Sequence, residues 1–267
     1  MERTAVLILG HGSRSAAANA EFEAFVGAYR LARPGLHVAH AYIELALPLL
    51  GEALAGLAKG ADHVVVLPLF LVAAGHVKHD LAEAVSQARR DFPAVRFTAA
   101  RPLGVHPGLV DLALERALPA LERIGDPAAA PVIVVGRGSS DPDANGDFCK
   151  IVRLFAERRG LRWAVPAFIG ITYPSFEEAA ELAARARPER LAVVPYFLFR
   201  GRLVDRLHGQ VAAFRKRHPS LATELAPYLG QDDRILALLD ERLREATEGG
   251  LPLPCDACSY RMPRAAA

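Results

Sequence analysis

Three histidines and one glutamate in the first half of the sequence could together bind a divalent metal ion. Each follows an apolar run of the kind that forms a buried β-strand, and these residues are His11, Glu44, His76 and His106. Two imidazoles and a carboxylate make a borderline-soft ligand set that suits Fe(II), Co(II), Ni(II) or Zn(II). Imidazole also titrates near neutral pH, so these residues could accept protons as well. The residue types therefore predict a transition-metal site that contains a base.

The individual candidates favour different roles. For His11 and His76 we favour metal ligation, because both are replaced by arginine at the matching places of the second half. Glu44 could instead cap the helix that follows it. His79, one helical turn beyond His76, could be solvated, and His106 stands at a helix start, where we favour a structural role.

Apolar runs typical of strands alternate with segments of helical period in both halves of the chain. In the first half we expect strands near 4–9, 37–42, 62–70 and 96–100 and helices near 16–31, 48–59, 77–91 and 107–124. In the second half we expect strands near 131–135, 162–168, 190–198 and 222–227, each followed by a helix. Strict alternation predicts an α/β fold with doubly wound parallel sheets in flavodoxin-like layers. Sites of such sheets lie beyond the carboxyl ends of the strands, so we expect the candidates to converge on one edge.

The chain is an internal duplication with an offset of 126 residues, the separation of Val6 from Val132. Residues 6–13 align with residues 132–139, and residues 41–43 align with residues 167–169. This pattern predicts two tandem domains of the same fold. We expect an N-terminal catalytic domain over 1–125, a C-terminal repeat with a degenerate site over 126–248, and a tail over 249–267.

The second repeat has lost the candidate ligands. Arg137, Gly170 and Arg202 stand where the first repeat has His11, Glu44 and His76, in that order. Arginine does not ligate metals or act as a base at neutral pH, but it binds carboxylates well. The second half is therefore predicted to hold an anionic ligand across a shared cleft, the alternative being that both arginines are solvated loop residues.

Basic residues gather near the predicted strand ends of both repeats. They are Arg14, Lys78, Arg101, Arg137, Arg200 and Arg202, and of these we assign Arg14, Lys78, Arg137 and Arg202 to substrate binding. A glycine-rich turn such as residues 10–13 can also bind phosphate. The chain lacks the spacing of a Walker loop or a dinucleotide fingerprint, however, so the sequence favours chemistry without a nucleotide.

Composition excludes several classes of function. The chain has 267 residues, 52% hydrophobic and 23% charged, which is typical of a globular protein. A formal net charge of +2 gives no nucleic-acid footprint. The longest apolar stretch, residues 64–74, contains Pro68 and is too short to cross a bilayer, and the N-terminus does not resemble a signal peptide. We expect a cytoplasmic monomer or homodimer without nucleic-acid or membrane partners.

The three cysteines are too few for a disulfide framework. Cys255 and Cys258 form a C-x-x-C pair in the tail, which could bind a soft metal or an iron–sulfur cluster. Two thiolates cannot complete a four-cysteine site, although a dimer could supply four. The alternative is a disordered tail with incidental thiols. Cys149 lies in a predicted helix, where we expect it to pack.

Residues 9–14, which read Leu-Gly-His-Gly-Ser-Arg, resemble the CbiX and SirB chelatases of the type II chelatase superfamily. Residues 68–71 and the pair Gly75-His76 share in this resemblance, which extends over about residues 4–245. The resemblance implies that His11 and His76 bind metal, with Glu44 as the associated acidic residue. It also implies an enzyme that inserts cobalt or iron into sirohydrochlorin without ATP, in cobalamin or siroheme biosynthesis.

Cobalt is favoured by resemblance only, because some long CbiX proteins carry a similar cysteine pair linked to an iron–sulfur cluster. This chain lacks the histidine-rich tract of some of those proteins. The alternatives are a sirohydrochlorin ferrochelatase and a metal- or tetrapyrrole-binding protein without catalysis. A hydrolase with His11 as nucleophile is disfavoured, because such enzymes have Arg-His-Gly where this chain has Gly-His-Gly.

Overall fold

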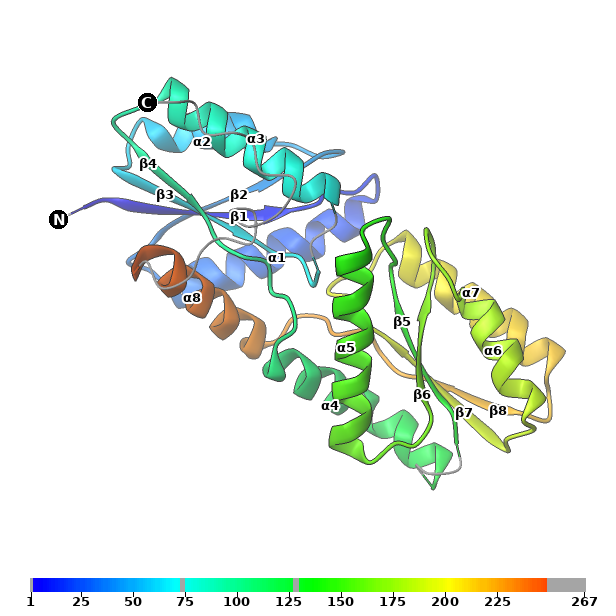
Figure 1. Cartoon of the computed structure of the whole chain (residues 1–267). Coiled ribbons are helices and arrows are strands. Elements are labelled where there is room, and N and C mark those ends of the chain that lie inside the picture. The colour runs from blue at the N-terminus through cyan, green and yellow to red at the C-terminus, as the bar shows by residue number, and fades with distance from the viewer. Residues whose placement is uncertain (1, 73–74, 127–129, 249–267) are drawn as a thin grey trace. The chain divides into compact units, whose positions relative to one another are not determined.

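The computed structural model describes residues 2–72, 75–126 and 130–248, without the side chains of His76 and Val77. In the first repeat the elements are β1 (Thr4–Gly10), α1 (Ala16–Ala32), β2 (His37–Tyr42), α2 (Leu50–Ala58), β3 (His63–Pro68), α3 (Gly75–Asp91), β4 (Arg96–Ala99) and α4 (Pro107–Ile124). In the second they are β5 (Val132–Gly136), α5 (Pro142–Arg159), β6 (Ala164–Phe168), α6 (Phe176–Arg185), β7 (Arg190–Pro195), α7 (Arg202–Arg217), β8 (Ala222–Leu225) and α8 (Asp233–Glu248). The predicted alternation is confirmed (Figure 1).

Two parallel four-stranded sheets form, with strand orders β2-β1-β3-β4 and β6-β5-β7-β8. The equivalent strands pair in the same order in both repeats, so the duplication seen in the sequence is a duplication of the fold. The expected runs 62–70 and 190–198 end early, at Pro68 and Pro195. The predicted class, two repeated α/β domains with doubly wound sheets, is confirmed.

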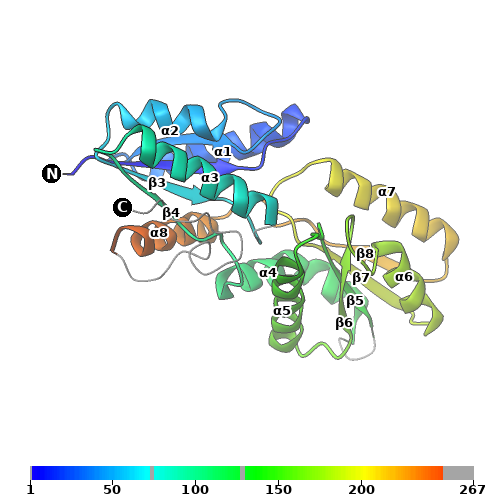
Figure 2. The same cartoon turned by 45° about the horizontal axis from the view of Figure 1, so that its top comes forward.

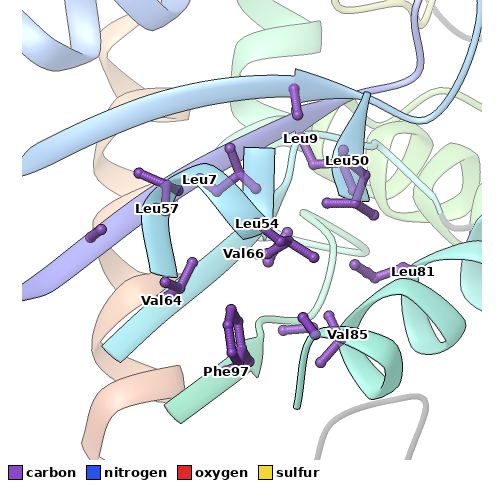
Figure 3. Close-up of a cluster of buried hydrophobic side chains, with 14 of the residues drawn as sticks. Leu7, Leu9, Leu50, Leu54, Leu57, Val64, Val66, Leu81, Val85 and Phe97 are labelled. Atoms are coloured by element: carbon purple, nitrogen blue, oxygen red, sulfur yellow. The ribbon is translucent and has the colours of Figure 1, made fainter. Parts of the chain in front are cut away.

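The first sheet is buried on both faces. On one face Leu7, Val66 and Phe97 pack against Leu54 of α2 and Val85 of α3 (Figure 3). The intervening strand residues point to the opposite face, which lies toward α1 and α8 (Figure 1). Strands buried on both sides explain the almost continuous apolar runs of β1 and β3.

The last helix of each repeat is exchanged. Among the described residues, the compact unit around the first sheet combines the chain up to Gly104 with residues 235–248, whereas residues 105–234 belong to the second unit. Thus α4 packs against β7, β8 and α5, while α8 lies beside the first sheet, as Figure 2 also shows.

The compact units therefore differ from the expected domains over 1–125 and 126–248. The sequence identifies the repeat correctly, but each repeat contributes its final helix to the other unit. The Pro- and Ala-rich joint near residue 126 consequently lies inside the second unit rather than between two units. Over the residues that the structure describes, no helix is long and apolar enough to cross a membrane.

Candidate functional site

Three candidate residues lie at the carboxyl edge of the first sheet. His11 follows β1 directly, Glu44 comes two residues after β2, and His76 is the second residue of α3, which follows β3. Because β2, β1 and β3 are adjacent parallel strands, their carboxyl ends meet at the same edge. The topology thus gathers the backbone of all three positions as expected.

The His11 and Glu44 side chains are close to each other. The His11 Nδ1 and Glu44 Oε1 atoms are 3.6 Å apart, with the imidazole partly buried and the carboxylate exposed. This separation is too long for a good hydrogen bond but suits two ligands that share one ion. Beneath them the Glu44 backbone N–H donates to the His11 carbonyl over 3.1 Å, which continues the β1–β2 pairing beyond the strands.

Glu44 does not cap the next helix. That helix, α2, begins at Leu50 with Leu49 as its N-cap residue, and the Leu49 N–H donates to the Glu52 carboxylate over 3.4 Å. The Glu44 carboxylate lies beside His11 instead. The geometry thus removes the capping alternative that the sequence left open.

Gly12 allows the close approach of the two loops. Its φ is +89°, and a Cβ at this position would lie only 1.7 Å from the Glu44 carbonyl oxygen. A side chain here would push the Glu44 backbone away from His11. The glycine that follows the histidine therefore positions the pair.

The third expected ligand is placed by its backbone alone, because the His76 side chain lies outside the described residues. Among the described side chains, no group of three His, Cys, Asp or Glu residues is arranged to hold a metal ion. Two of the three expected donors are nevertheless adjacent, and the third begins the helix beside them.

The remaining histidines have other environments. His79 is exposed on α3, and its Nδ1 lies 3.7 Å from Asp80 and 3.8 Å from Glu83. His106 is the N-cap of α4, and its Nδ1 accepts a hydrogen bond of 3.1 Å from the Gly108 N–H. The preferred structural role of His106 is thus confirmed. His106 follows β4 along the chain but belongs to the second compact unit, and its expected convergence with His11 and Glu44 stays a prediction.

The basic residues fall into two groups. Arg101 donates to Glu245 of α8 over 2.8 Å, and Arg200 donates to Asp205 over 3.1 Å, so both guanidinium groups have carboxylate partners. The Arg101 guanidinium also holds the pKa of the Glu245 carboxyl below its usual range. The residues assigned to substrate binding are exposed or partly buried, at loop and helix starts, and they are Arg14, Lys78, Arg137 and Arg202.

The second repeat keeps the loop geometry without the donors. Gly138 has a φ of +82°, and a Cβ there would lie 2.2 Å from the carbonyl oxygen of Gly170. The Ile169 N–H donates to the Gly136 carbonyl over 3.0 Å, just as the Ile43 N–H donates to the Gly10 carbonyl over 3.0 Å. The backbone of the site has been conserved between the repeats while its ligands have not.

Several features were missed or misjudged in the sequence. Cys149 is exposed on α5 rather than packed, and its neighbour Phe148 fills the core instead. Cys255 and Cys258 lie outside the described residues. Leu45 and Leu47, beside Glu44, are exposed although they are large and apolar. Their apolar equivalents at the 126-residue offset were the signal that could have identified them.

Comparison with known proteins gives matches over nearly the whole chain. The CbiX family model matches twice, over residues 5–120 and 131–246. Sirohydrochlorin cobaltochelatase of Priestia megaterium is 34% identical over 260 residues, which cover 96% of this chain and 84% of that protein. Sirohydrochlorin ferrochelatase of Bacillus subtilis is 29% identical over 247 residues, which cover 91% and 92%.

The fold is similar to that of solved structures as well. The structure of SirB from Bacillus subtilis with Fe3+ matches with a TM-score of 0.79 and 28% identity, covering 93% of this chain and 98% of that one. The sirohydrochlorin chelatase SirB of Bacillus subtilis subspecies spizizenii, in complex with cobalt, matches with a TM-score of 0.77 and 26% identity, covering 93% and 97%.

Proposed function

Because this chain belongs to the CbiX family, we propose that it is a sirohydrochlorin chelatase, an enzyme that inserts a divalent metal ion into a tetrapyrrole. The observation that carries the proposal is the His11–Glu44 pair at the carboxyl edge of the first sheet. The family match to both halves of the chain supports it. Relatives named cobaltochelatase and ferrochelatase cover more than nine-tenths of the chain, at 96% and 91%.

The metal ion is a substrate of this reaction and must be held loosely enough to leave. His11 and Glu44, with His76 as third ligand, would leave coordination positions open for the incoming pyrrole nitrogens. Insertion forms four metal–nitrogen bonds and releases two pyrrole N–H protons. As the metal passes to the macrocycle, the freed Glu44 carboxylate and His11 imidazole become available to accept those protons.

We propose Co2+ as the preferred metal, with Fe2+ as the alternative. The cobaltochelatase relative is 34% identical and the ferrochelatase relative 29% identical to this chain. An iron–sulfur cluster at Cys255 and Cys258, a monomeric or dimeric state and a cytoplasmic location stay predictions from the sequence.

The test is a direct insertion assay. The purified protein is mixed anaerobically with sirohydrochlorin and with Co2+, Fe2+ or Ni2+ in turn, and the pigment's absorption bands are followed. We expect the spectrum of the metallated product to appear faster than without protein, and fastest with Co2+. Stoichiometric binding without turnover would instead identify a non-catalytic tetrapyrrole-binding protein.

Arg137 and Arg202 would bind carboxylates of the substrate, which carries eight. Guanidinium groups stay protonated at working pH and grip carboxylates through paired hydrogen bonds. Since a charge-assisted hydrogen bond contributes about 1.5–3 kcal/mol, Arg202→Ala should raise the Michaelis constant for sirohydrochlorin roughly ten- to a hundredfold. Metal affinity should stay unchanged. Unaltered tetrapyrrole affinity in an Arg137→Ala/Arg202→Ala double variant would refute this role.

A further inference from the structure

Leu45 is the central residue of a strained turn directly beside the metal-site carboxylate. Its φ is +64°, and the Ala46 N–H donates to the Glu44 carbonyl over 2.8 Å. These features define a γ-turn with positive φ, the rarer and more strained of the two γ-turn forms. A left-handed backbone is unfavourable for leucine, and glycine would adopt it without a penalty. Such strain is typically retained where function needs it.

The side chains of this turn are exposed although they are apolar. Leu45 is 49% exposed and Leu47 is 72% exposed. Backbone hydrogen bonds hold the loop at both ends, with the Tyr42 N–H donating to the Pro48 carbonyl over 2.9 Å and the Glu44 N–H donating to His11. The two leucines are therefore presented to solvent by a fixed backbone. We call Leu45 and Leu47 the leucine ledge.

The second repeat keeps the same feature where the metal ligands have been lost. Ile171 has a φ of +69°, and the Thr172 N–H donates to the Gly170 carbonyl over 2.8 Å, so the same turn forms. Ile171 is 63% exposed and Tyr173 is 77% exposed, at an offset of 126 residues from the leucine ledge. Metal ligation cannot explain the exposed apolar pair, because Gly170 replaces Glu44 in this repeat. The exposed apolar residues at this turn therefore have a role other than metal binding.

We propose that the leucine ledge contacts the apolar face of the tetrapyrrole macrocycle and seats it over the metal; this rests on the proposed function. A metal held by Glu44 bonds the central nitrogens at about 2 Å during transfer, so the ring must pass over the residues next to Glu44. Leu45 is the adjacent residue. The substrate combines largely apolar ring faces with a charged rim, which matches apolar side chains beside basic ones.

The experiment separates substrate seating from stability. Leu45→Gly removes the side chain and also relieves the backbone strain, so the protein should be as stable as the wild type or more so. Leu47→Ser removes the second contact. Binding of metal-free sirohydrochlorin is titrated by its fluorescence, and Co2+ affinity, thermal unfolding and sedimentation are measured in parallel. Leu31→Ala is the matched control, because Leu31 is 84% exposed near the far end of α1, away from the site edge.

We expect the Leu45→Gly/Leu47→Ser variant to bind sirohydrochlorin about tenfold more weakly or worse, because the apolar area buried against the ring is lost. Co2+ affinity should be unchanged, the melting temperature should be unchanged or higher, and Leu31→Ala should bind sirohydrochlorin as the wild type does. Unaltered sirohydrochlorin binding in the double variant overturns the proposal, and so does a loss of self-association without a loss of binding, which would make the ledge a contact between copies. Wild-type protein that neither binds nor metallates sirohydrochlorin would overturn the proposed function as well.

Discussion

His11 can be tested as a metal ligand separately from the fold, because it lies in a loop and not in the core. We expect His11→Ala and His76→Ala each to lower the insertion rate by roughly a hundredfold or more, since two of three expected metal donors cannot hold the ion alone. Glu44→Gln should slow insertion less predictably, because Glu44 could act as ligand or as proton acceptor.

The measurement is the anaerobic absorbance assay, with circular dichroism to verify the fold. His37→Ala is the control, because His37 is exposed at the amino end of β2, at the opposite edge of the sheet. Near-normal turnover of His11→Ala would remove His11 from the site.

Gly12 offers a test that has an internal control in the second repeat. Gly12→Ala and Gly138→Ala should both destabilise the protein by about 2–4 kcal/mol, because each adds a Cβ at positive φ against a carbonyl oxygen. Only Gly12→Ala displaces the Glu44 backbone, so only this variant should lose Co2+ affinity. Thermal unfolding and Co2+ titration measure the two effects. Equal Co2+ affinity in both variants would show that Glu44 does not bind the metal.

At the residue scale, the sequence predicted the polar residues of the candidate site better than the apolar ones. His11 and Glu44 could be predicted to meet because parallel strands end at a common edge, and their side chains do lie close together. The leucine ledge was overlooked because an apolar residue in a loop does not by itself indicate exposure, and the matching apolar pair at the 126-residue offset was not used. Only the backbone reveals that Leu45 is held at φ +64°.

At the scale of the secondary-structure elements, side-chain hydrogen bonds hold α8 to the rest of the first unit. Arg242 is buried on it and donates to the Pro102 and Leu103 carbonyls over 3.2 Å and 3.1 Å. Tyr29 donates to Asp240 over 2.8 Å from α1. Helical period predicted this helix, but amphipathic periodicity says only that one face is buried, not which sheet buries it.

The ion pair between Arg101 and Glu245 should make the docking of α8 sensitive to pH. The pKa of the Glu245 carboxyl is lowered below the ordinary value of 4.5, chiefly because Arg101 donates a hydrogen bond to it. A lowered folded-state pKa contributes stability above the unfolded-state value, and this stability is lost as pH falls through the folded-state value. We expect Glu245→Gln to cost about 1–3 kcal/mol at pH 7 and progressively less below pH 4.5.

Denaturant unfolding of wild type and variant across pH 3–7 measures this difference, with intervals of about half a unit around the carboxyl range. Glu248→Gln is the control, because Glu248 is an exposed carboxylate on the same helix. A constant difference between wild type and Glu245→Gln at every pH would show that the pair contributes no pH-dependent stability.

At the scale of the whole molecule, the exchange of α4 and α8 means that the repeat is not the unit of folding. The 126-residue offset identifies two repeats, but it does not indicate whether the last helix of each repeat packs on the sheet of its own repeat or on the other sheet. The answer depends on the path between β4 and α4 and between β8 and α8, which carries no local signature in the sequence. The expected domain boundaries were therefore those of the sequence repeat, whereas the compact units of the structure are set by which helices pack on which sheet.

Removal of α8 should unfold one unit and spare the other. A chain ending at Arg234 lacks the buried Ile235, Leu238 and Leu239, and losing three such side chains costs about 5–8 kcal/mol, close to the stability of a domain. The contiguous second unit should still unfold cooperatively in calorimetry, while metal insertion is abolished. Truncation after Gly250 is the control and should leave insertion within a few-fold of wild type. An intact first-unit transition without α8 would contradict the exchanged arrangement.

The exchanged helix also reverses the usual order of folding during synthesis. Domains generally fold from the N-terminus as the ribosome releases them. Here the strands of the first sheet emerge within the first 104 residues, but α8, the helix that completes their unit, is translated only after the second unit. The second unit, already contiguous, can finish earlier. Until α8 has been synthesised, the face of the first sheet toward α8 is covered by α1 alone and stays partly exposed, so we expect the N-terminal segment to depend most on chaperones.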